Sequence, residues 1–398
     1  MSKTQKVLLI FLILPLLIDI FQAAPNALPD AGDGRSVISV VSTPPSLSAT
    51  SAVLMEAESG RLLYAKNADT PLPMASTTKI MTALVALECA SPDRVITVAP
   101  EAVGVEGSSV YLTEGEELTL EELLYALLLE SANDAATAIA VGLSRSTEAF
   151  AEQMNRKAAE LGLTRTHFTN PHGLDHPEHY TTAHELAVIA QAALKNETIR
   201  TIVSTRKATI PHSGEDGVRL LVNHNKLLRT YEGCIGVKTG YTRSSGRCLV
   251  SAAERDGVTL IAVTIRDPND WQDHSALLDY GFSLCHSVTL AGKGSIAVSL
   301  PVVGGTEESI SLSNREDCTV TLPRSAGTVR IVLEYRRFEY APIAKDEPLG
   351  NAVFYADRDG DGTCETVARI PLLADTAVEK QPTKKGWLAR IFSFFDRS

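Results

Sequence analysis

Ser76-Thr77-Thr78-Lys79 is followed along the chain by Ser131-Ala132-Asn133 and then by Lys238-Thr239-Gly240. Each of these stretches is common by itself. The ordered set is specific, because it supplies a hydroxyl, a lysine amine, a second hydroxyl with an amide, and a lysine beside a glycine. These groups complement one another chemically, so we expect the three stretches to meet in one active site.

Ser76 and Lys79 can form a nucleophile and its base. A serine hydroxyl attacks poorly unless a neighbouring base takes its proton. Residues three apart share one face of a helix, so the Lys79 amine can reach the Ser76 hydroxyl. Lys79 accepts a proton only when neutral, which requires burial or a nearby cation to lower its pKa. We expect Lys238 to be that cation.

The other two stretches suit the handling of a peptide substrate. Ser131 can relay a proton between Lys79 and a leaving group, and Asn133 can orient a peptide. Lys238 and Thr239 lie on an expected edge strand, from which they can bind the carboxylate of the substrate. Gly240 lets a substrate backbone come close to that strand.

An oxyanion hole must accompany a serine that attacks a carbonyl, because negative charge develops on its oxygen. The backbone N–H groups of Ser76, at the start of a helix, and of Tyr241 are the expected donors. Thr242 completes the predicted substrate-binding set. No catalytic histidine is required.

Beyond these motifs the chain resembles the low-molecular-mass penicillin-binding proteins of the Gram-positive type, which are serine D-alanyl-D-alanine carboxypeptidases. The resemblance covers roughly residues 47–285, and more loosely the rest. It is carried by Pro73–Leu84, Gly107–Leu112, Leu123–Ala136, Phe168–Leu174, Asn225–Leu228, Gly236–Thr242 and Leu277–Phe282.

The resemblance implies that Ser76 attacks the carbonyl of the penultimate D-Ala of a peptidoglycan stem peptide and releases the terminal D-Ala. It also implies inhibition by β-lactams, which acylate the same serine. Some relatives carry a carboxylate-binding arginine where this chain has Asp270-Trp271-Gln272-Asp273. Arg266 and Arg243 are weak replacements, and His184 departs from the family as well.

The predicted fold is α+β. The resemblance implies a β-lactamase/transpeptidase-like catalytic domain over residues 47–286, with a five-stranded antiparallel sheet flanked by helices. Helices are expected from Ser76 to Glu88 and over Leu120–Leu129, and strands over Cys234–Gly240 and Cys248–Arg255. Short β-prone runs separated by turn residues predict a small β-sandwich domain over residues 288–374.

The sequences at the two ends of the chain suggest that the protein is exported and associates with a membrane. Residues 1–24 have the basic start and short apolar run of a signal peptide, with an uncleaved anchor as the alternative. A flexible leader is expected over 25–46 and a polar linker over 375–385. Residues 386–398 predict a basic amphipathic helix in a membrane interface, against the alternative of a helix docked on the core. The expected location is therefore the outer face of the cytoplasmic membrane or the cell wall.

Composition and cysteine spacing exclude other functions. The net charge of −11 argues against nucleic acid as a partner. No C-x-x-C pair occurs, and the histidines from His172 to His184 match no metal-binding spacing, so neither metal nor cofactor is expected. Asp357–Gly362 is interpreted as a hairpin turn rather than a calcium loop. Cys234 and Cys248 can be a cross-strand disulfide or buried thiols.

Three other functions remain open from the sequence. A serine β-lactamase shares the motifs but is usually single-domain and released. A D,D-endopeptidase acting on cross-links uses the same machinery. A wall-binding or scaffold protein is disfavoured because every catalytic residue type is present.

Overall fold

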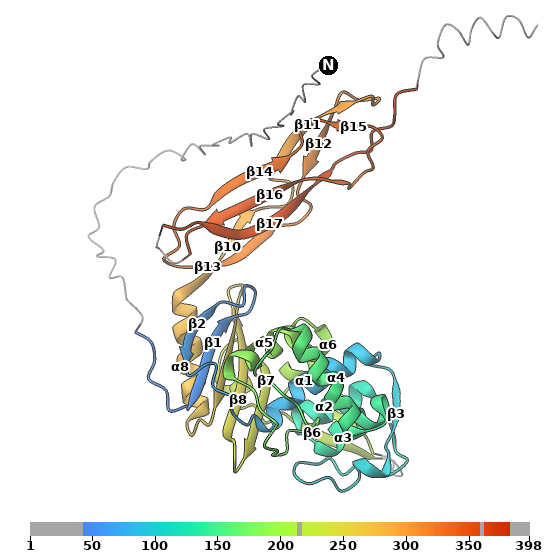
Figure 1. Ribbon diagram of the computed structural model, residues 1–398, viewed down its shortest axis with the longest axis vertical. Coiled ribbons are helices and arrows are strands. Elements are labelled where there is room, and N and C mark those ends of the chain that lie inside the picture. Colours follow the sequence, from blue (N-terminus) through green and yellow to red (C-terminus); the bar gives the residue numbers. More distant parts are fainter. Residues whose placement is uncertain (1–42, 213–216, 359–361, 383–398) are drawn as a thin grey trace, which may run out of the picture. The chain divides into compact units, whose positions relative to one another are not determined.

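A computed structural model describes residues 43–212, 217–358 and 362–382 (Figure 1). Contacts divide the chain into one unit that ends at Ser287 and another that begins at Val288. The predicted signal peptide, most of the leader and the predicted helix over 386–398 lie outside the described residues. Within the described ranges, no helix combines the length and the apolar character needed to cross a membrane.

The first unit is built on a five-stranded antiparallel sheet, which confirms the prediction. Its strand order is β2-β1-β9-β8-β7, so β1 of the N-terminal hairpin pairs with β9, more than 200 residues later in the chain. The turn between β8 and β9 is tight because Asp256 and Gly257 both adopt positive φ. The strands are β1 (Ser51–Glu56), β2 (Leu62–Lys66), β7 (Cys234–Thr242), β8 (Gly246–Arg255) and β9 (Val258–Ile265).

Helices cover both faces of this sheet. Alternate side chains of β1, such as Val53 and Leu54, face opposite cores. Most helices pack on the Val53 side, and α8 packs on the Leu54 side through Leu277 and Leu278. They are α1 (Lys79–Cys89), α2 (Leu120–Leu129), α3 (Asn133–Ser144), α4 (Thr147–Glu160), α5 (Ala183–Leu194), α6 (Glu197–Ser204), α7 (Leu227–Thr230) and α8 (Asp270–Leu284), with 3-10 turns η1 (Ala75–Thr78) and η2 (Pro100–Ala102).

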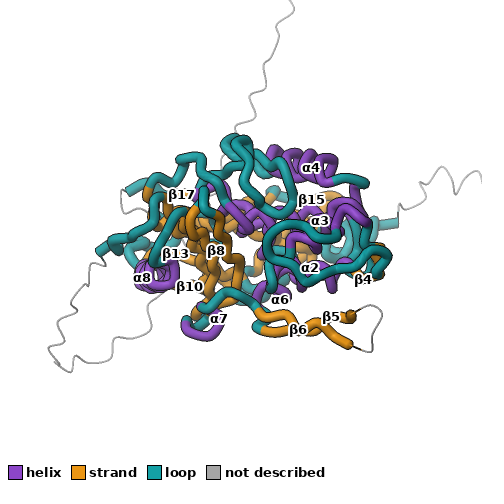
Figure 2. The backbone as a smooth tube through the Cα atoms, turned by 90° about the horizontal axis from the view of Figure 1, so that it is seen from below, coloured by secondary structure: helices purple, strands orange, loops and turns teal. Residues whose placement is uncertain are grey.

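Two short two-stranded sheets, not predicted from the sequence, complete this unit. One pairs β3 (Val95–Thr97) with β4 (Glu117–Thr119), and the other pairs β5 (Lys207–His212) with β6 (Gly217–Val222). Figure 2 shows the β5–β6 hairpin at the rim of the unit, below α2 and α6.

The second unit is a β domain, as predicted. A six-stranded sheet of order β14-β16-β17-β12-β11-β15 and the pair β10-β13 share one apolar core that includes Leu300, Leu322 and Phe354. Its strands are β10 (Cys285–Ala291), β11 (Ala297–Val303), β12 (Ser309–Ser313), β13 (Cys318–Pro323), β14 (Arg330–Tyr335), β15 (Glu339–Tyr340), β16 (Pro348–Ala356) and β17 (Glu365–Ala374).

The structure departs from the expected polar linker over 375–385. The side chain of Asp375 pairs with Arg315, and Val378 is buried and bridges to Ile343. The backbone N–H of Gln381 donates to the Gly304 carbonyl at 2.8 Å. Residues 375–381 therefore form part of the β domain. Although the stretch is polar in composition, the buried Val378 and the backbone hydrogen bonds attach it to that domain.

Cys234 and Cys248 are free thiols rather than a disulfide. Cys234 pairs with Ala253, whereas Cys248 pairs with Gly240 at the other end of the β7–β8 ladder. Six residues along a strand separate the two positions by about 20 Å. A disulfide requires Cα atoms within about 7 Å, so this hairpin cannot form one.

Candidate active site

Ser76 lies in a 3-10 turn rather than in the α-helix expected from the sequence. The turn spans Ala75–Thr78, and α1 begins at Lys79. Ala75 adopts a φ of 49°, a left-handed conformation that is strained for a residue with a Cβ. Side chains at i and i+3 eclipse in a 3-10 turn, so Ser76 and Lys79 come together as predicted, though for a different local reason.

Lys79 is fully buried and surrounded by three oxygen atoms. Its Nζ lies 3.0 Å from Ser76 Oγ, 2.6 Å from Asn133 Oδ1 and 2.6 Å from the His172 carbonyl oxygen. A neutral amine has two N–H donors and one lone pair. The two carbonyl oxygens can accept both N–H bonds, which leaves the lone pair for the Ser76 hydroxyl proton.

The surroundings of Lys79 favour its neutral form. Burial lowers its pKa well below the ordinary value, and the nearby charge of Lys238 lowers it further, whereas Asp134 acts in the opposite direction. Lys238 is itself buried, and desolvation lowers its pKa to about 7. Its Nζ donates to the Thr239 carbonyl at 2.9 Å. The expected influence of Lys238 on Lys79 is therefore present, but burial is the larger cause.

Asn133 and Ser131 flank the start of α3. Asn133 accepts from Lys79 and donates through Nδ2 to the Glu106 carbonyl at 2.6 Å. Its amide thus positions Lys79, a contact that the sequence did not predict. Ser131 adopts a φ of 62° and is nearly buried, and its hydroxyl has no hydrogen-bond partner among the described residues. A hydroxyl without an internal partner is suited to a relay.

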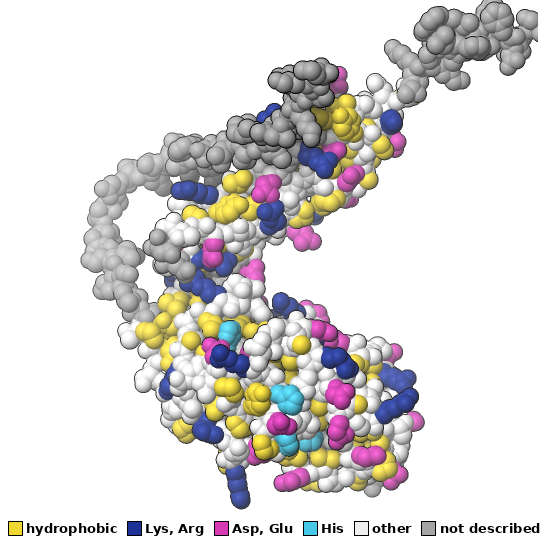
Figure 3. Space-filling view, in the orientation of Figure 1, with side chains coloured by type: hydrophobic (Ala, Val, Ile, Leu, Met, Phe, Trp, Pro, Cys, Tyr) yellow, Lys and Arg dark blue, Asp and Glu magenta, His cyan; other side chains and the backbone are white. Residues whose placement is uncertain are grey.

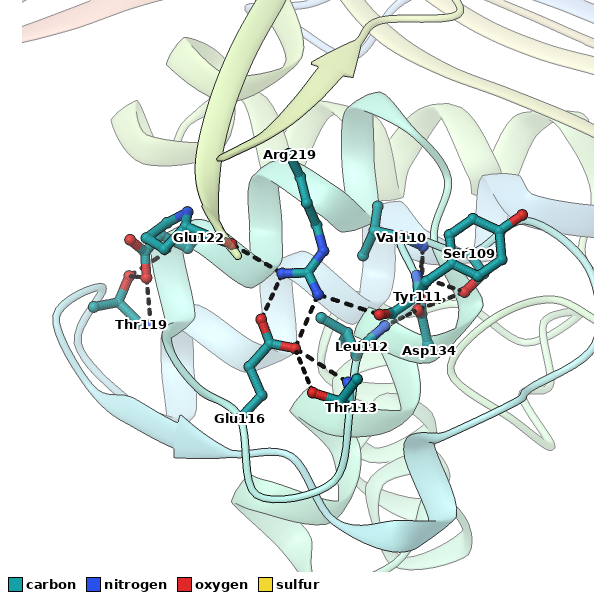
Figure 4. Close-up of polar contacts among 11 residues, drawn as sticks. Ser109, Val110, Tyr111, Leu112, Thr113, Glu116, Thr119, Glu122, Asp134 and Arg219 are labelled. Atoms are coloured by element: carbon teal, nitrogen blue, oxygen red, sulfur yellow. Dashed lines mark hydrogen bonds and ion pairs between the residues drawn. The ribbon is translucent and has the colours of Figure 1, made fainter. Parts of the chain in front are cut away.

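The Asp134 side chain holds the loop over residues 106–112, which lies beside Asn133 (Figure 4). The buried Asp134 carboxylate accepts from the Ser109 hydroxyl at 2.6 Å and from the backbone N–H groups of Val110 and Leu112 at 3.1 Å. Hydrogen bonds to a carboxylate are stronger than those between neutral groups. The loop that supplies the Glu106 carbonyl to Asn133 is therefore fixed.

A buried ion pair secures the same loop from the β5–β6 hairpin. Figure 4 shows Arg219 reaching from its strand onto Glu116, with both terminal guanidinium nitrogens engaged. Arg219 also donates to the Tyr111 carbonyl at 3.2 Å. The side chains of Glu116 and Arg219 are 1% and 8% exposed. This pair couples the hairpin to the loop beside Asn133.

Edge strand β7 runs beside the nucleophile. A Cβ on Gly240 would lie only 3.1 Å from the backbone nitrogens of Ser76 and Thr77, so glycine permits this close approach. Tyr241 is exposed, and Thr242 donates through Oγ1 to Asp175 at 2.8 Å.

A cavity of about 500 Å³ adjoins this end of β7. Asp175, the partner of Thr242, lines it. Its other lining residues are Pro71, Leu72, Pro73, His176, Pro177, His179, Tyr180 and Ser244.

The loop from Asn170 to Leu174 is a part of the site to which the sequence analysis assigned no role. Its His172 carbonyl accepts from Lys79. Gly173 has a φ of 88°, and a Cβ there would lie 2.0 Å from the Ala75 carbonyl oxygen. The Asn-Pro-His-Gly sequence, which is typical of a tight turn, was the only feature of the sequence that could have indicated this close contact.

The histidines of this region have internal partners. His179 contacts Thr78 Oγ1 at 2.8 Å and accepts from the Thr169 N–H at 3.1 Å. Burial lowers the pKa of His179 to about 3 and that of His172 to about 4. His184 faces Asp69 at 3.2 Å.

Most arginines near the expected binding site of the substrate carboxylate already bond to other groups of the protein. Arg266 donates to the Ser244 carbonyl at 2.9 Å. Asp270, which occupies the stretch that departs from the family, is clamped by Arg247, with contacts of 2.8–3.0 Å. Arg243 is exposed. The sequence did not identify Arg247.

Comparisons with known proteins agree on the class. The family model for D-alanyl-D-alanine carboxypeptidase matches residues 38–269, and the model for the penicillin-binding protein 5 C-terminal domain matches residues 286–380. D-alanyl-D-alanine carboxypeptidase DacF of Bacillus subtilis is 32% identical over 83% of this chain and 86% of its own length.

Two further relatives extend this agreement. DacB2 of Mycobacterium tuberculosis, also named a D-alanyl-D-alanine carboxypeptidase, is 36% identical over 58% of this chain and 81% of its own length. The solved structure of penicillin-binding protein 5 from Haemophilus influenzae matches with a TM-score of 0.65 and 28% identity, over 85% of this chain and 99% of that one. With a family model that spans more than half of its length, this chain belongs to the serine D-alanyl-D-alanine carboxypeptidase family of penicillin-binding proteins.

Proposed function

We propose that this chain removes the terminal D-Ala from peptidoglycan stem peptides through an acyl-enzyme on Ser76. The observation that carries the proposal is the 3.0 Å contact between Ser76 Oγ and the buried Lys79 Nζ. This contact joins a hydroxyl to an amine whose pKa is lowered by burial and by Lys238. Such an amine is a competent general base near neutral pH.

Acylation then follows from the geometry of the site. Neutral Lys79 takes the Ser76 proton while Oγ attacks the carbonyl carbon of the penultimate D-Ala. The backbone N–H groups of Ser76 and Tyr241 donate hydrogen bonds to the oxyanion. A pair of donors aimed at this developing charge lowers the barrier to acylation strongly. The C–N bond breaks, and the amine of the departing D-Ala receives the proton from Lys79 through Ser131.

Residues of the edge strand β7 orient the substrate. Lys238, Thr239 and Thr242 meet the terminal carboxylate, and Gly240 lets the substrate backbone lie against the strand. Asn133 orients the peptide and, through the contact described above, also fixes Lys79. Water then attacks the ester with Lys79 again as the base, which releases the shortened peptide.

β-Lactams enter the same path as stem-peptide mimics. Ser76 opens the lactam ring, and the expelled amine stays tethered to the acyl group. It does not diffuse away as D-Ala does, so the covalent complex persists. This reaction needs no metal or cofactor.

We also propose that the enzyme is exported and held at the outer face of the cytoplasmic membrane. The supporting observations are the signal-like pattern of residues 1–24 and the basic amphipathic pattern of residues 386–398. Stem peptides lie outside the cytoplasm, so the substrate requires the same location.

The experiment is release of free D-Ala from diacetyl-Lys-D-Ala-D-Ala by the mature chain, with and without penicillin. Release that penicillin blocks supports the proposal. Rapid penicillin hydrolysis without D-Ala release would indicate a β-lactamase instead. Stable penicillin labelling without either activity would indicate an endopeptidase or a specialised substrate.

A further inference from the structure

An apolar patch lies on the β domain, far in sequence from the active site. It consists of Val303 at the end of β11, Phe338 just before β15 and Tyr340 within β15, with exposed fractions of 45%, 45% and 63%. Val303 and Tyr340 are register partners, and the Phe338 and Tyr340 rings meet edge to face at 5.4 Å. Figure 3 shows hydrophobic side chains gathered over β15. We call these three residues the aromatic patch.

The aromatic patch inverts the usual alternation of a strand. A half-buried strand turns its apolar side chains inward and its charged ones outward. Here Phe338 and Tyr340 face outward, whereas the Glu339 side chain between them is only 17% exposed and pairs with Arg336 at 2.9 Å. The two aromatic rings thus face solvent while the charged side chain between them is the more covered one. Contiguous exposed apolar surface of this kind marks an interaction site.

The end of the described chain lies against the aromatic patch. The Gln381 N–H donates to the carbonyl of Gly304, the residue after Val303, and Gly305 bridges to Lys380. The predicted amphipathic segment begins at Gly386, five residues later. An extended chain covers at most about 3.5 Å per residue, so Gly386 lies within about 18 Å of Gln381. Any surface that holds residues 386–398 is therefore within reach of the patch.

The chemistry of the patch suits a lipid headgroup region. Tyr is favoured where an apolar ring enters the acyl boundary while its hydroxyl remains hydrated. Phe is common on the apolar faces that enter the same boundary. Arg336 and Arg337 are exposed beside it, and Arg337 has no ion partner within the described residues. Glu379 and Glu339 offset part of this charge, so aromatic insertion should contribute more than attraction to anionic lipid.

We propose that the aromatic patch is a second membrane contact, which inserts Phe338 and Tyr340 into the interface beside the C-terminal segment. This inference rests on the membrane association proposed above. Two contacts hold a protein far better than one, because the second binds at a high effective concentration. The pair would also restrict the orientation of the β domain at the bilayer.

The test is co-sedimentation of the full mature chain with vesicles of phosphatidylcholine and phosphatidylglycerol. The variant is Phe338→Ser with Tyr340→Ser, whose side chains are exposed and contribute little to the core. The matched control is Val218→Ser with Leu220→Ser, an exposed apolar pair at 68% and 60% on the β5–β6 hairpin. Thermal unfolding of the full chain checks that each variant is folded, and D-Ala release from a soluble peptide checks its catalytic unit.

We expect the patch variant to lose roughly tenfold or more in vesicle affinity, with a weak dependence on salt, and the control to bind like wild type. Equal binding of patch variant and wild type, with binding lost on deletion of 386–398, would overturn the inference and leave the membrane proposal intact. If wild type does not bind vesicles at all, the membrane proposal fails and this inference fails with it.

A second readout separates membrane insertion from protein contact. In a Trp387→Phe background, Phe338→Trp should gain fluorescence quenching by brominated lipids, whereas Val218→Trp should not. If the patch variant instead changes the sedimentation of the protein without vesicles, and Phe338→Trp is not quenched, the patch joins copies of this chain and the inference is wrong.

Discussion

Replacing Lys238 by methionine should stabilise the fold while it removes activity. The buried Lys238 has a pKa of about 7 in the folded chain, against about 10.5 when unfolded. Between these values the unfolded chain binds more protons, so wild-type stability rises with pH across this window. The cost of holding the lysine in the fold is about 4 kcal/mol at pH 7 and becomes small near pH 10.5.

Methionine has a similar volume and does not titrate. It forfeits the bond to the Thr239 carbonyl, which contributes about 1 kcal/mol. We therefore expect Lys238→Met to be about 3 kcal/mol more stable than wild type at pH 7, and about equally stable near pH 10.5.

The assay is urea unfolding of both proteins across this pH range, followed by the fluorescence of Trp271 in the catalytic unit. D-Ala release is measured in parallel and should be lost, because the substrate carboxylate loses its cationic partner. A stability difference that stays constant from pH 7 to pH 10.5 would refute the reasoning, since only a titrating lysine produces the convergence.

Three further predictions concern the site and its support. Ser76→Ala should abolish both penicillin labelling and D-Ala release without loss of thermal stability, and labelling that persists would mean that another nucleophile is used. Glu116→Gln should cost about 3–5 kcal/mol in urea unfolding because Arg219 is left buried without its counter-charge, whereas Glu116→Leu with Arg219→Met should be near neutral; equal losses in both variants would contradict this. Gly240→Ala should lower kcat/KM at least tenfold, because its Cβ meets the backbone nitrogens of Ser76 and Thr77 at 3.1 Å; unchanged kinetics would show that β7 is free to shift.

The proximity of Ser76 and Lys79 could be predicted because the two residues are only three apart in sequence. A hydroxyl, an amine three residues away and two partner motifs in order predict the meeting of Ser76, Lys79 and Lys238. The nearly continuous apolar runs of β8 and β9 likewise fit central strands that are buried on both faces. The 3-10 turn at Ser76 was not predicted, because the helix-forming residues that follow it carry no sign of the left-handed Ala75.

Other parts of the site depend on pairings that no local pattern encodes. Glu116 and Arg219 lie 103 residues apart in sequence, and each alone resembles an ordinary surface charge. The Asn133 contact to Lys79 and the His172 carbonyl likewise arise only when distant segments meet. The bonding of residues 375–381 to the β domain was missed because backbone hydrogen bonds leave no trace in composition.

The most direct test of the central claim is to trap the penicillin acyl-enzyme of the mature chain and map the modified peptide by mass spectrometry. The account predicts one adduct per chain, on Ser76, and a marked slowing of its formation in Lys79→Met. An adduct on any other residue would contradict the account, and so would an unchanged acylation rate in Lys79→Met.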